Sequence, residues 1–266
     1  MNSTDEERAR RLAQLLTTAR YGRSLTALTR TGSTNDDAQR AAAEGAVDGH
    51  VVVADTQAAG RGSQGRSWSS PSGSDLYLSI VDRPRVALAA LPPLTLAVGL
   101  GVADTVQARL DAQGHREPAQ VKWPNDVWIG GRKCAGILVE ASSMAQDVQA
   151  VVIGIGLNVN RTSFDPELAD TATSLRACDP AAAQIDRDAV MAELLSHVER
   201  RVEQFVETGP APIAAAVDVR LAMRDRRVRC GQVHGWLRGV APSGAVRIET
   251  SAGPQEVIAG RLLLDE

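Results

Sequence analysis

The stretch VVVADTQAAGRGSQGRSWSSPSGSDLYLSIV, residues 51–81, decides the fold because it puts two apolar runs on either side of a glycine-rich loop. Val51–Thr56 and Leu76–Val81 are short and rich in β-branched and other apolar residues, as buried strands are. The loop between them, GRGSQGRSW at 60–68, combines three glycines with two arginines. Glycine lets backbone N–H groups approach an anion closely, and arginine adds permanently charged, bidentate donors. By itself such a loop is also typical of a flexible surface segment, so its surroundings must decide.

The segments on both sides alternate between strand and helix patterns. Upstream, a strand ends near Arg30, and a helix begins at Ser33 or Thr34 and ends at Gly45. Ser33 has the spacing of an N-terminal cap. Downstream, CAGILVEAS (134–142) and VQAVVIGIGLNVN (148–160) are expected to pair as a hairpin. Mixed strands with interspersed helices predict an α+β, or mixed α/β, layer fold.

Two further helices and a small all-β segment complete the prediction. A helix over Asp186–Glu207 is capped by Asp186 and stopped by Gly209-Pro210. Its apolar face comprises Val190, Leu194, Val198, Val202, Phe205 and Val206. The apolar stretch Val86–Ala103 nearly reaches membrane-spanning length, but Pro92-Pro93 splits it, so a buried helix is expected. Beyond about Met223, short alternating runs separated by PSG and SAGP turns predict a small β-barrel.

The N-terminal residues argue against export and against DNA binding. They are charged and lack the apolar core of a signal peptide, so a cytoplasmic location is expected. A helix over about Asp5–Ala19 is too short for a helix-turn-helix domain, and the net charge of −3 argues against a general polyanion binder. Neither specific DNA binding nor a membrane partner is expected.

The cysteines and histidines predict no metal site built from the protein. Cys134, Cys178 and Cys230 are odd in number and more than forty residues apart, which fits neither a disulfide framework nor paired zinc ligands. The four histidines are equally scattered. Reduced thiols and no protein metal cage are therefore expected.

Two lysines and a glycine-bearing strand point to an anionic and a flat ligand. Lys122 and Lys133 flank a WPND turn and a GG turn, and Lys133 opens an apolar strand, where an ammonium group needs an anionic partner such as a phosphate. GIGLN at 154–158 lacks the third glycine of a dinucleotide fingerprint, and no GK[ST] follows a glycine run. Alternating glycines indicate either a bulge with tight packing or a flat ligand lying on the strand.

Six ordered motifs together resemble the biotin protein ligases over roughly residues 24–266. They are STN at 33–35, Gln57 before GRGSQGRSW, KWPND at 122–126, GRKCAGILVE at 131–140, GIGLNVN at 154–160 and ATSL at 172–175. The resemblance implies a class II synthetase-like mixed sheet with helices, followed by an SH3-like β-barrel. It divides the chain into an N-terminal helical extension (1–23), a biotin- and ATP-binding catalytic domain (24–221) and the barrel (222–266). Without a winged helix, the chain is expected to be a monofunctional ligase, either a monomer or a homodimer.

The resemblance also implies the chemistry and the residues that perform it. Family members adenylate biotin with Mg²⁺-bound ATP and then transfer the biotinyl group to a lysine of a biotin carboxyl carrier domain. The residues expected to bind biotin are Ser33, Thr34, Asn35, Gln57, Arg61, Gly62, Ser63, Lys133, Gly136, Gly154 and Gly156. Those expected to bind ATP are Arg61, Arg66, Trp68, Lys122, Asn125 and Asn158, with Trp68 and Asn158 at the adenine end.

Four residues are expected to act in catalysis: Lys133, Arg61, Lys122 and Asp126. Attack of a carboxylate on the α-phosphate brings two anions together, so cations must offset charge at both. Lys133 is expected to touch the biotin carboxylate and the α-phosphate. Asp126 either accepts a proton from the carrier lysine or only caps the WPND turn, and the sequence leaves both open.

The position of Ser63 departs from the family pattern, which commonly has a basic residue there. A neutral hydrogen bond is roughly half as strong as a charge-assisted one, so the loop is expected to retain biotinyl-AMP less well. Two alternatives to the ligase are a lipoate or octanoate ligase or transferase, and a non-enzymatic biotin sensor. The KWPND and GRGxxGR pair argues against the first, and the joint presence of Lys122 and Lys133 argues against the second.

Overall fold

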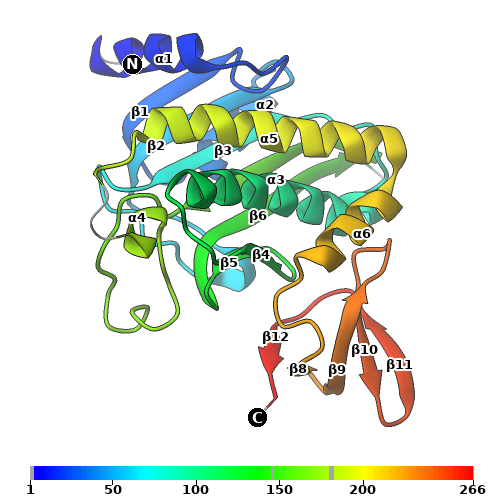
Figure 1. Cartoon of the computed structure of the whole chain (residues 1–266). Coiled ribbons are helices and arrows are strands. Elements are labelled where there is room, and N and C mark those ends of the chain that lie inside the picture. The colour runs from blue at the N-terminus through cyan, green and yellow to red at the C-terminus, as the bar shows by residue number, and fades with distance from the viewer. Residues whose placement is uncertain (1–2, 145–146, 180–182, 266) are drawn as a thin grey trace.

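The computed structural model describes residues 3–144, 147–179 and 183–265, arranged as a large mixed sheet with helices and a smaller antiparallel sheet (Figure 1). The helices are α1 (Ser3–Leu15), α2 (Thr34–Ala43), α3 (Leu91–Ala112), α4 (Leu175–Cys178), α5 (Arg187–Thr208) and α6 (Pro210–Val219), with short 3-10 turns η1 (Ser63–Gly65) and η2 (Leu88–Ala90). The first seven strands are β1 (Leu25–Thr31), β2 (His50–Gln57), β3 (Leu76–Asp82), β4 (Ala119–Lys122), β5 (Asp126–Ile129), β6 (Arg132–Met144) and β7 (Asp147–Leu157). The remaining strands are β8 (Arg227–Cys230), β9 (Val233–Val240), β10 (Val246–Thr250), β11 (Gly253–Val257) and β12 (Leu262–Leu264).

The large sheet confirms the mixed α+β prediction. Its strand order is β1-β2-β3-β7-β6-β5-β4, with β1 and β2 parallel and the other neighbours antiparallel. The predicted hairpin of the two glycine-bearing segments is the β6–β7 pair, in which Gly136 lies opposite Gly156 and Leu138 opposite Gly154. The loop at 60–68 connects β2 to β3, as the two flanking apolar runs predict.

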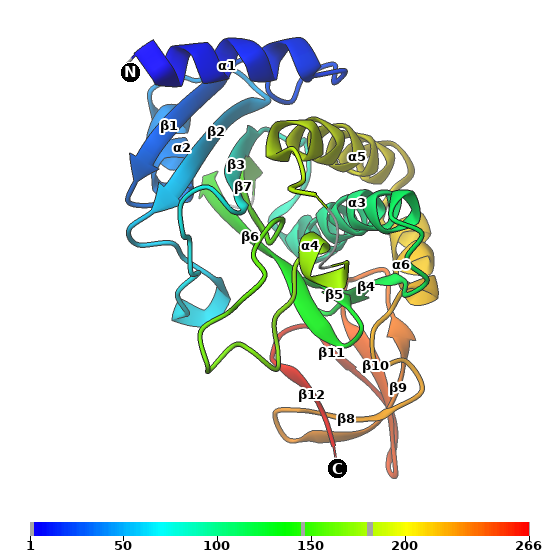
Figure 2. The same ribbon diagram turned by 60° about the vertical axis from the view of Figure 1, so that its left-hand side comes forward.

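The alternation of side chains along β2 explains why helices cover both faces of the sheet. Val51 and Val53 belong to the main core with α3 and α5, whereas Val52 packs with Ala38 of α2 in a smaller cluster on the other face. α3 and α5 run side by side over the first face (Figures 1 and 2). On the second face α2 packs against β2, β3 and β7 at one end only, so the strands beyond it remain available for a site.

Two helices differ from the sequence prediction for identifiable reasons. α1 ends at Leu15 rather than Ala19, because the backbone N–H groups of residues 19–21 donate to the Glu199 carboxylate instead of continuing the helix. α3 has Pro92-Pro93 in its first turn as expected but continues past Asp104, whose carboxylate pairs with Arg201 and Arg220. None of the described helices is long and apolar enough to cross a membrane.

The two predicted helix caps have different outcomes. Asp186 caps α5, and its carboxylate accepts hydrogen bonds from the N–H groups of Asp188 and Ala189. Ser33 holds the N-cap position of α2, but its side chain makes no capping hydrogen bond. On α5 the predicted apolar face is buried except for Val206, which is 47% exposed in the last turn of the helix.

The C-terminal segment forms a five-stranded antiparallel sheet in the order β11-β10-β9-β8-β12, which hangs below the large sheet in Figure 1. It is joined to the large sheet through Trp123, whose indole Nε1–H donates to the carbonyl of Gly244 at 2.8 Å. The boundaries predicted after residues 23 and 221 stay predictions, and the outer limits at Met1 and Glu266 lie outside the described residues.

Candidate functional site

The glycine-rich loop is a miniature hairpin rather than a flexible segment. Gly62 N–H donates to the carbonyl of Arg66 at 2.7 Å, and Trp68 N–H donates to that of Gly60 at 2.8 Å. The tip is made by Gln64 and Gly65, with φ of 59° and 72° in the left-handed region. At that tip the guanidinium of Arg66 donates to the carbonyl of Ser63 at 3.2 Å and to its hydroxyl at 3.1 Å. A cation thus lies beside Ser63, although the sequence has none at that position.

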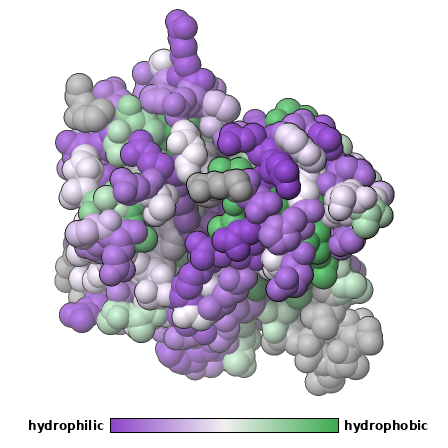
Figure 3. Space-filling view, turned by 90° about the horizontal axis from the view of Figure 1, so that it is seen from below, coloured by the Kyte–Doolittle hydropathy of each residue, from purple (hydrophilic) through white to green (hydrophobic). Residues whose placement is uncertain are grey.

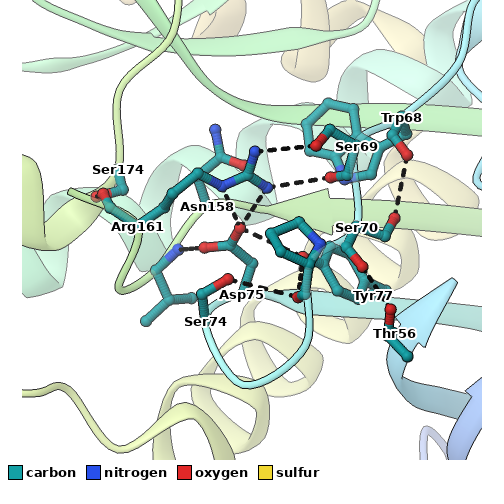
Figure 4. Close-up of polar contacts among 12 residues, drawn as sticks. Thr56, Trp68, Ser69, Ser70, Ser74, Asp75, Tyr77, Asn158, Arg161 and Ser174 are labelled. Carbon is teal, nitrogen blue, oxygen red and sulfur yellow. Dashed lines mark hydrogen bonds and ion pairs between the residues drawn. The ribbon is translucent and has the colours of Figure 1, made fainter. Parts of the chain in front are cut away.

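The end of the loop is fixed by a buried ion pair (Figure 4). The Asp75 carboxylate is fully buried and accepts from Arg161 at 2.5 Å and from the N–H of Val159 at 2.8 Å. Arg161 also donates to the carbonyl of Ser69 at 3.0 Å, directly after Trp68. A buried ion pair with its remaining hydrogen bonds satisfied holds one geometry. The segment after β7 is thereby tied to the segment that carries Trp68.

A small cavity lies between this loop and the free face of the sheet. Its lining includes every residue that the sequence predicts for biotin, drawn from α2, β2, the loop, β6 and β7: Ser33, Thr34, Asn35, Gln57, Arg61, Gly62, Ser63, Lys133, Gly136, Gly154 and Gly156. Trp68 and Asn125 also line it. Residues more than a hundred positions apart in sequence are therefore brought together.

Neutral hydrogen-bonding groups form one side of the small cavity. Gln57 Oε1 accepts from the backbone N–H of Thr34 at 2.8 Å, and the Ser79 hydroxyl contacts Asn35 Oδ1 at 2.6 Å. Asn35 Nδ2 donates to Glu140 at 2.7 Å. These bonds fix the direction in which each amide presents its remaining donor or acceptor.

Arg61 lies at the same edge and is held by two carboxylates. Its guanidinium is 2.7 Å from Asp36 and 2.8 Å from Glu140, and its side chain is about two-fifths exposed at 39%. The sequence prediction missed Ser79 and Glu140. Ser79 gives a usable signal, since it is a polar residue inside the apolar run LYLSIV.

The floor of the cavity is made by glycines, and Trp68 lies over it. A Cβ atom at Gly156 would come within 2.4 Å of the Trp68 indole, and one at Gly136 within 2.9 Å. At Gly154 a Cβ would meet the Asn35 amide at 2.1 Å. The glycines are thus required for close approach of the sheet to side chains above it. The indole Nε1–H of Trp68 is buried and has no hydrogen-bond partner among the described residues.

A larger cavity of about 570 Å³ opens beside the small one and shares Gly62, Ser63, Trp68, Asn125 and Lys133 with it. It is lined by the predicted ATP residues Arg66, Trp68, Lys122, Asn125 and Asn158, together with Asp126. Arg61, also predicted for ATP, lines only the small cavity. Seen from below Figure 1, the surface of the molecule is mostly hydrophilic, with smaller apolar patches (Figure 3).

The cations of the larger cavity differ in their environment. Lys122 is buried and its ammonium lies 5.8 Å from the centre of the Trp128 ring. Burial lowers the pKa of Lys122, against the opposing effect of Asp126.

Asn158, which the sequence predicts at the adenine end, already has a partner within the protein, because its Nδ2–H donates to the carbonyl of Thr173 at 2.9 Å.

Lys133 lies at the junction of the two cavities. Its ammonium is 2.6 Å from the Asp126 carboxylate and 5.2 Å from the centre of the Trp68 ring. Its backbone is held by the ATSL segment and the residue before it: the Lys133 N–H donates to the carbonyl of Thr171 at 2.7 Å, and the Thr173 N–H donates to the carbonyl of Lys133 at 2.9 Å. The Asp126 carboxylate thus faces Lys133 across the β5–β6 pair.

No cluster of three or more potential metal ligands occurs among the described residues. All three cysteines are free thiols.

Comparisons with known proteins agree over nearly the whole chain. Residues 27–158 match the biotin/lipoate A/B protein ligase family. The biotin–[acetyl-CoA-carboxylase] ligase of Mycobacterium tuberculosis is 37% identical over 254 residues, covering 93% of this chain and 91% of that protein. The bifunctional ligase/repressor BirA of Bacillus spizizenii is 34% identical, covering 87% of this chain and 71% of that protein.

A solved structure shares the arrangement of both sheets. The biotin protein ligase of Aquifex aeolicus, in complex with biotin and ATP, superposes with a TM-score of 0.76 at 28% identity, over 91% of this chain and 98% of that one. Because relatives more than 30% identical are matched over most of their length, and not the loop segment alone, the chain belongs to the biotin protein ligase family.

Proposed function

We propose that this ligase binds biotin in the small cavity and Mg²⁺-bound ATP in the larger one, and that Lys133 acts where the two substrates meet. The ATP-dependent activation of biotin follows from the family and its relatives. The assignment of residues rests on one observation, which is that Lys133 and Trp68 belong to both cavities. The carboxylate of one substrate and the α-phosphate of the other would therefore meet beside a single ammonium group.

The small cavity suits biotin in hydrogen bonding. The fixed amides and hydroxyls at its edge suit a ureido group, and the Trp68 indole, which lies on the glycine floor, would move off it to admit the flat bicycle. Arg61 and Lys133 suit the carboxylate at the other end of the ligand. The buried, unpaired indole N–H of Trp68 is a further donor for a bound oxygen.

The larger cavity suits a nucleotide with its own metal ion. Lys122 and Arg66 suit the phosphates, and the apolar side chains of Trp128 and Phe164 suit a base. Since the described residues contain no cluster of metal ligands, Mg²⁺ would arrive on the phosphates and keep most of its waters. When bound, the ion would offset phosphate charge.

In the first step a carboxylate oxygen of biotin would attack the α-phosphorus, forming biotinyl-AMP as the bond to pyrophosphate breaks. Lys133 would oppose the charge that builds on the phosphate. In the second step the carrier lysine amine would attack the biotinyl carbonyl, and AMP would leave. Asp126 is the carboxylate suited to receive the proton of that amine, at the cost of its pair with Lys133.

Pyrophosphate exchange into ATP tests the substrate assignment. We expect exchange that depends on both biotin and Mg²⁺, because activation is reversible until transfer. The matched family also includes lipoate ligases, so lipoate and octanoate are the informative alternatives. Equal exchange with lipoate would contradict the biotin assignment, and binding without exchange would favour a sensor.

The carrier is tested separately. We expect transfer from preformed biotinyl-AMP to a biotin carboxyl carrier domain of a biotin-dependent carboxylase. In single-turnover experiments Asp126→Asn is expected to slow this transfer more than it slows activation. An equal loss in both steps would assign Asp126 to the positioning of Lys133.

A further inference from the structure

The carboxylate of Glu140, on β6, gathers three side-chain donors beside the small cavity. Its Oε2 accepts hydrogen bonds from Asn35 Nδ2 at 2.7 Å and from Gln39 Nε2 at 3.1 Å, both on α2. It also accepts one from the Arg61 guanidinium at 2.8 Å. Glu140 itself does not line the cavity, whereas Asn35 and Arg61 do. Glu140 therefore acts on a bound ligand through these two side chains.

The orientation of the Asn35 amide follows from this carboxylate. An asparagine amide can be rotated by half a turn, which exchanges a hydrogen-bond acceptor for a donor. An ionised carboxylate only accepts, so Glu140 requires the NH2 group of Asn35 to face it. The amide oxygen is thereby turned toward Gly154, where a Cβ atom would lie 2.1 Å from Oδ1 and 3.0 Å from Nδ2. Asn35 thus presents an acceptor over the glycine floor of the cavity.

The neighbouring hydroxyl of Ser79 cannot set this orientation by itself. It is fully buried and lies 2.6 Å from Asn35 Oδ1 and 2.8 Å from Thr34 Oγ1. A hydroxyl can donate or accept, so it would satisfy either end of the Asn35 amide. Of the two partners that the described residues give this amide, only Glu140 is restricted to accepting.

The other end of this row of polar groups is fixed by a group that only donates. The backbone N–H of Thr34 donates to Gln57 Oε1 at 2.8 Å, so the amide of Gln57 also has one allowed orientation. The Thr34 hydroxyl donates to the same oxygen at 3.1 Å, which leaves its own oxygen to accept from Ser79. From Gln57 to Glu140, each hydrogen bond therefore has a fixed direction.

We propose that Glu140 is a positioning residue that determines specificity, because it makes Asn35 an acceptor and so selects a ligand with an N–H group over Gly154. This rests on the proposed function, in which that ligand is biotin and the N–H group belongs to its ureido ring. A lipoyl or octanoyl chain has no N–H group to offer. It would leave the Asn35 oxygen buried without a partner, which opposes binding.

The test exchanges the roles of the two side chains. Glu140→Gln lets the Asn35 amide turn either way, and biotin affinity, measured by calorimetry, is expected to fall about tenfold. Asn35→Asp places two carboxylates side by side and is expected to weaken biotin binding at least as much. Asn35→Asp combined with Glu140→Gln again has one carboxylate and one amide, with an acceptor facing the cavity. This double variant is expected to recover biotin affinity to within about threefold of the wild type.

Asp36→Asn is the matched control for the contact with Arg61. Asp36 is the other carboxylate on that guanidinium, at 2.7 Å, and its replacement leaves the Asn35 amide bonded to Glu140. Biotin affinity is therefore expected to fall less in Asp36→Asn than in Glu140→Gln. In pyrophosphate exchange, Glu140→Gln is expected to raise KM for biotin and to leave KM for ATP unchanged, since its effect passes through the small cavity.

The possible outcomes separate this proposal from the proposed function. Absence of biotin binding by the wild type would overturn both. Normal binding by the wild type with unchanged affinity in Glu140→Gln would overturn this proposal alone. Losses that simply add in the double variant would do the same, because a carboxylate that only packs beside α2 gains nothing from an exchange of roles. An equal loss in Asp36→Asn would assign the effect of Glu140 to Arg61 and would also overturn the proposal.

Discussion

At the scale of single residues, Lys133 and Asp126 set the charge at the junction of the cavities. Their 2.6 Å ion pair keeps the ammonium at a fixed place on the edge of β6. Before substrates bind, the carboxylate compensates the ammonium in a site where an unpaired charge is costly. In the proposed reaction the biotin carboxylate and the α-phosphate would take over that partnership, and the cation would become available without moving its backbone.

Removing this ammonium is expected to slow activation strongly. Lys133→Ala is expected to reduce the rate of biotinyl-AMP formation by about 100-fold or more, equivalent to ~3 kcal/mol, the scale for a preorganised charge at a transition state. Single-turnover formation of the adenylate measures this. Lys133→Arg, which keeps the charge, is expected to lose less. A normal rate in Lys133→Ala would show that the lysine is a bystander.

Ser63 stands where the family commonly has a basic residue, and in the structure the guanidinium of Arg66 partly replaces that charge. Arg66 folds back over the tip and donates to Ser63, so positive charge is present but depends on a neutral contact. Ser63→Arg is expected to reduce release of biotinyl-AMP in the absence of a carrier, measured together with stray biotinylation of bystander lysines. Ser67→Arg, on the loop but away from the tip, is the matched control. If Ser63→Arg releases adenylate as fast as the wild type, position 63 does not retain it.

At the scale of elements, the β6–β7 hairpin and the loop above it fit together because the hairpin bears glycine where the loop bears tryptophan. Gly156→Ala is expected to displace the Trp68 indole, since its new Cβ would lie within 2.4 Å of the ring. Biotin affinity, measured by calorimetry, is expected to fall about tenfold or more, as for other changes that disturb a preformed pocket. Gly65→Ala at the loop tip, where nothing lies within 4 Å but φ is 72°, strains the loop backbone without crowding the floor. Equal affinity in Gly156→Ala and the wild type would contradict the close fit.

The sequence predicts these elements better than it predicts their contacts. The hairpin partners, the strands around residues 51–81 and the biotin-side residues follow from local patterns and ordered motifs, because apolar periodicity and glycine positions are local properties. The end of α1 depends on Glu199, which is far away in the chain. The Asn158 amide, predicted to bind ATP, donates one of its hydrogen bonds to the carbonyl of Thr173. Such contacts are set by tertiary packing, which single-sequence patterns do not contain.

At the scale of the whole molecule, a buried carboxylate away from the site makes stability depend on pH. Asp82 is 1% exposed, and burial raises its pKa to about 6, above its usual 3.8, despite a 3.0 Å hydrogen bond from Arg20. The folded state therefore binds a proton more tightly than the unfolded state. The stability that this protonation contributes to the folded state is complete below pH 3.8 and is lost as pH rises through about 6.

Removing this titration is expected to change the pH profile in a defined direction. Asp82→Asn cannot ionise, so its free energy of unfolding relative to the wild type is expected to rise between pH 4 and pH 7, by up to about 3 kcal/mol. Denaturant unfolding at several pH values measures this difference, in which the other carboxylates cancel. Parallel profiles for the two proteins would mean that Asp82 keeps an ordinary affinity for protons.

The hydrogen bond from Trp123 to Gly244 has a consequence for the motions of the molecule. Trp123 is 1% exposed and belongs to the WPND turn between Lys122 and Asp126, whereas Gly244 belongs to the turn that joins β9 and β10 of the C-terminal sheet. A substrate that binds more tightly when this hydrogen bond is formed must also stabilise the C-terminal sheet against local opening. The two effects have the same coupling free energy. Amide hydrogen exchange in β9 and β10 is expected to slow when biotin and ATP are added, although neither strand lines the small cavity proposed for biotin.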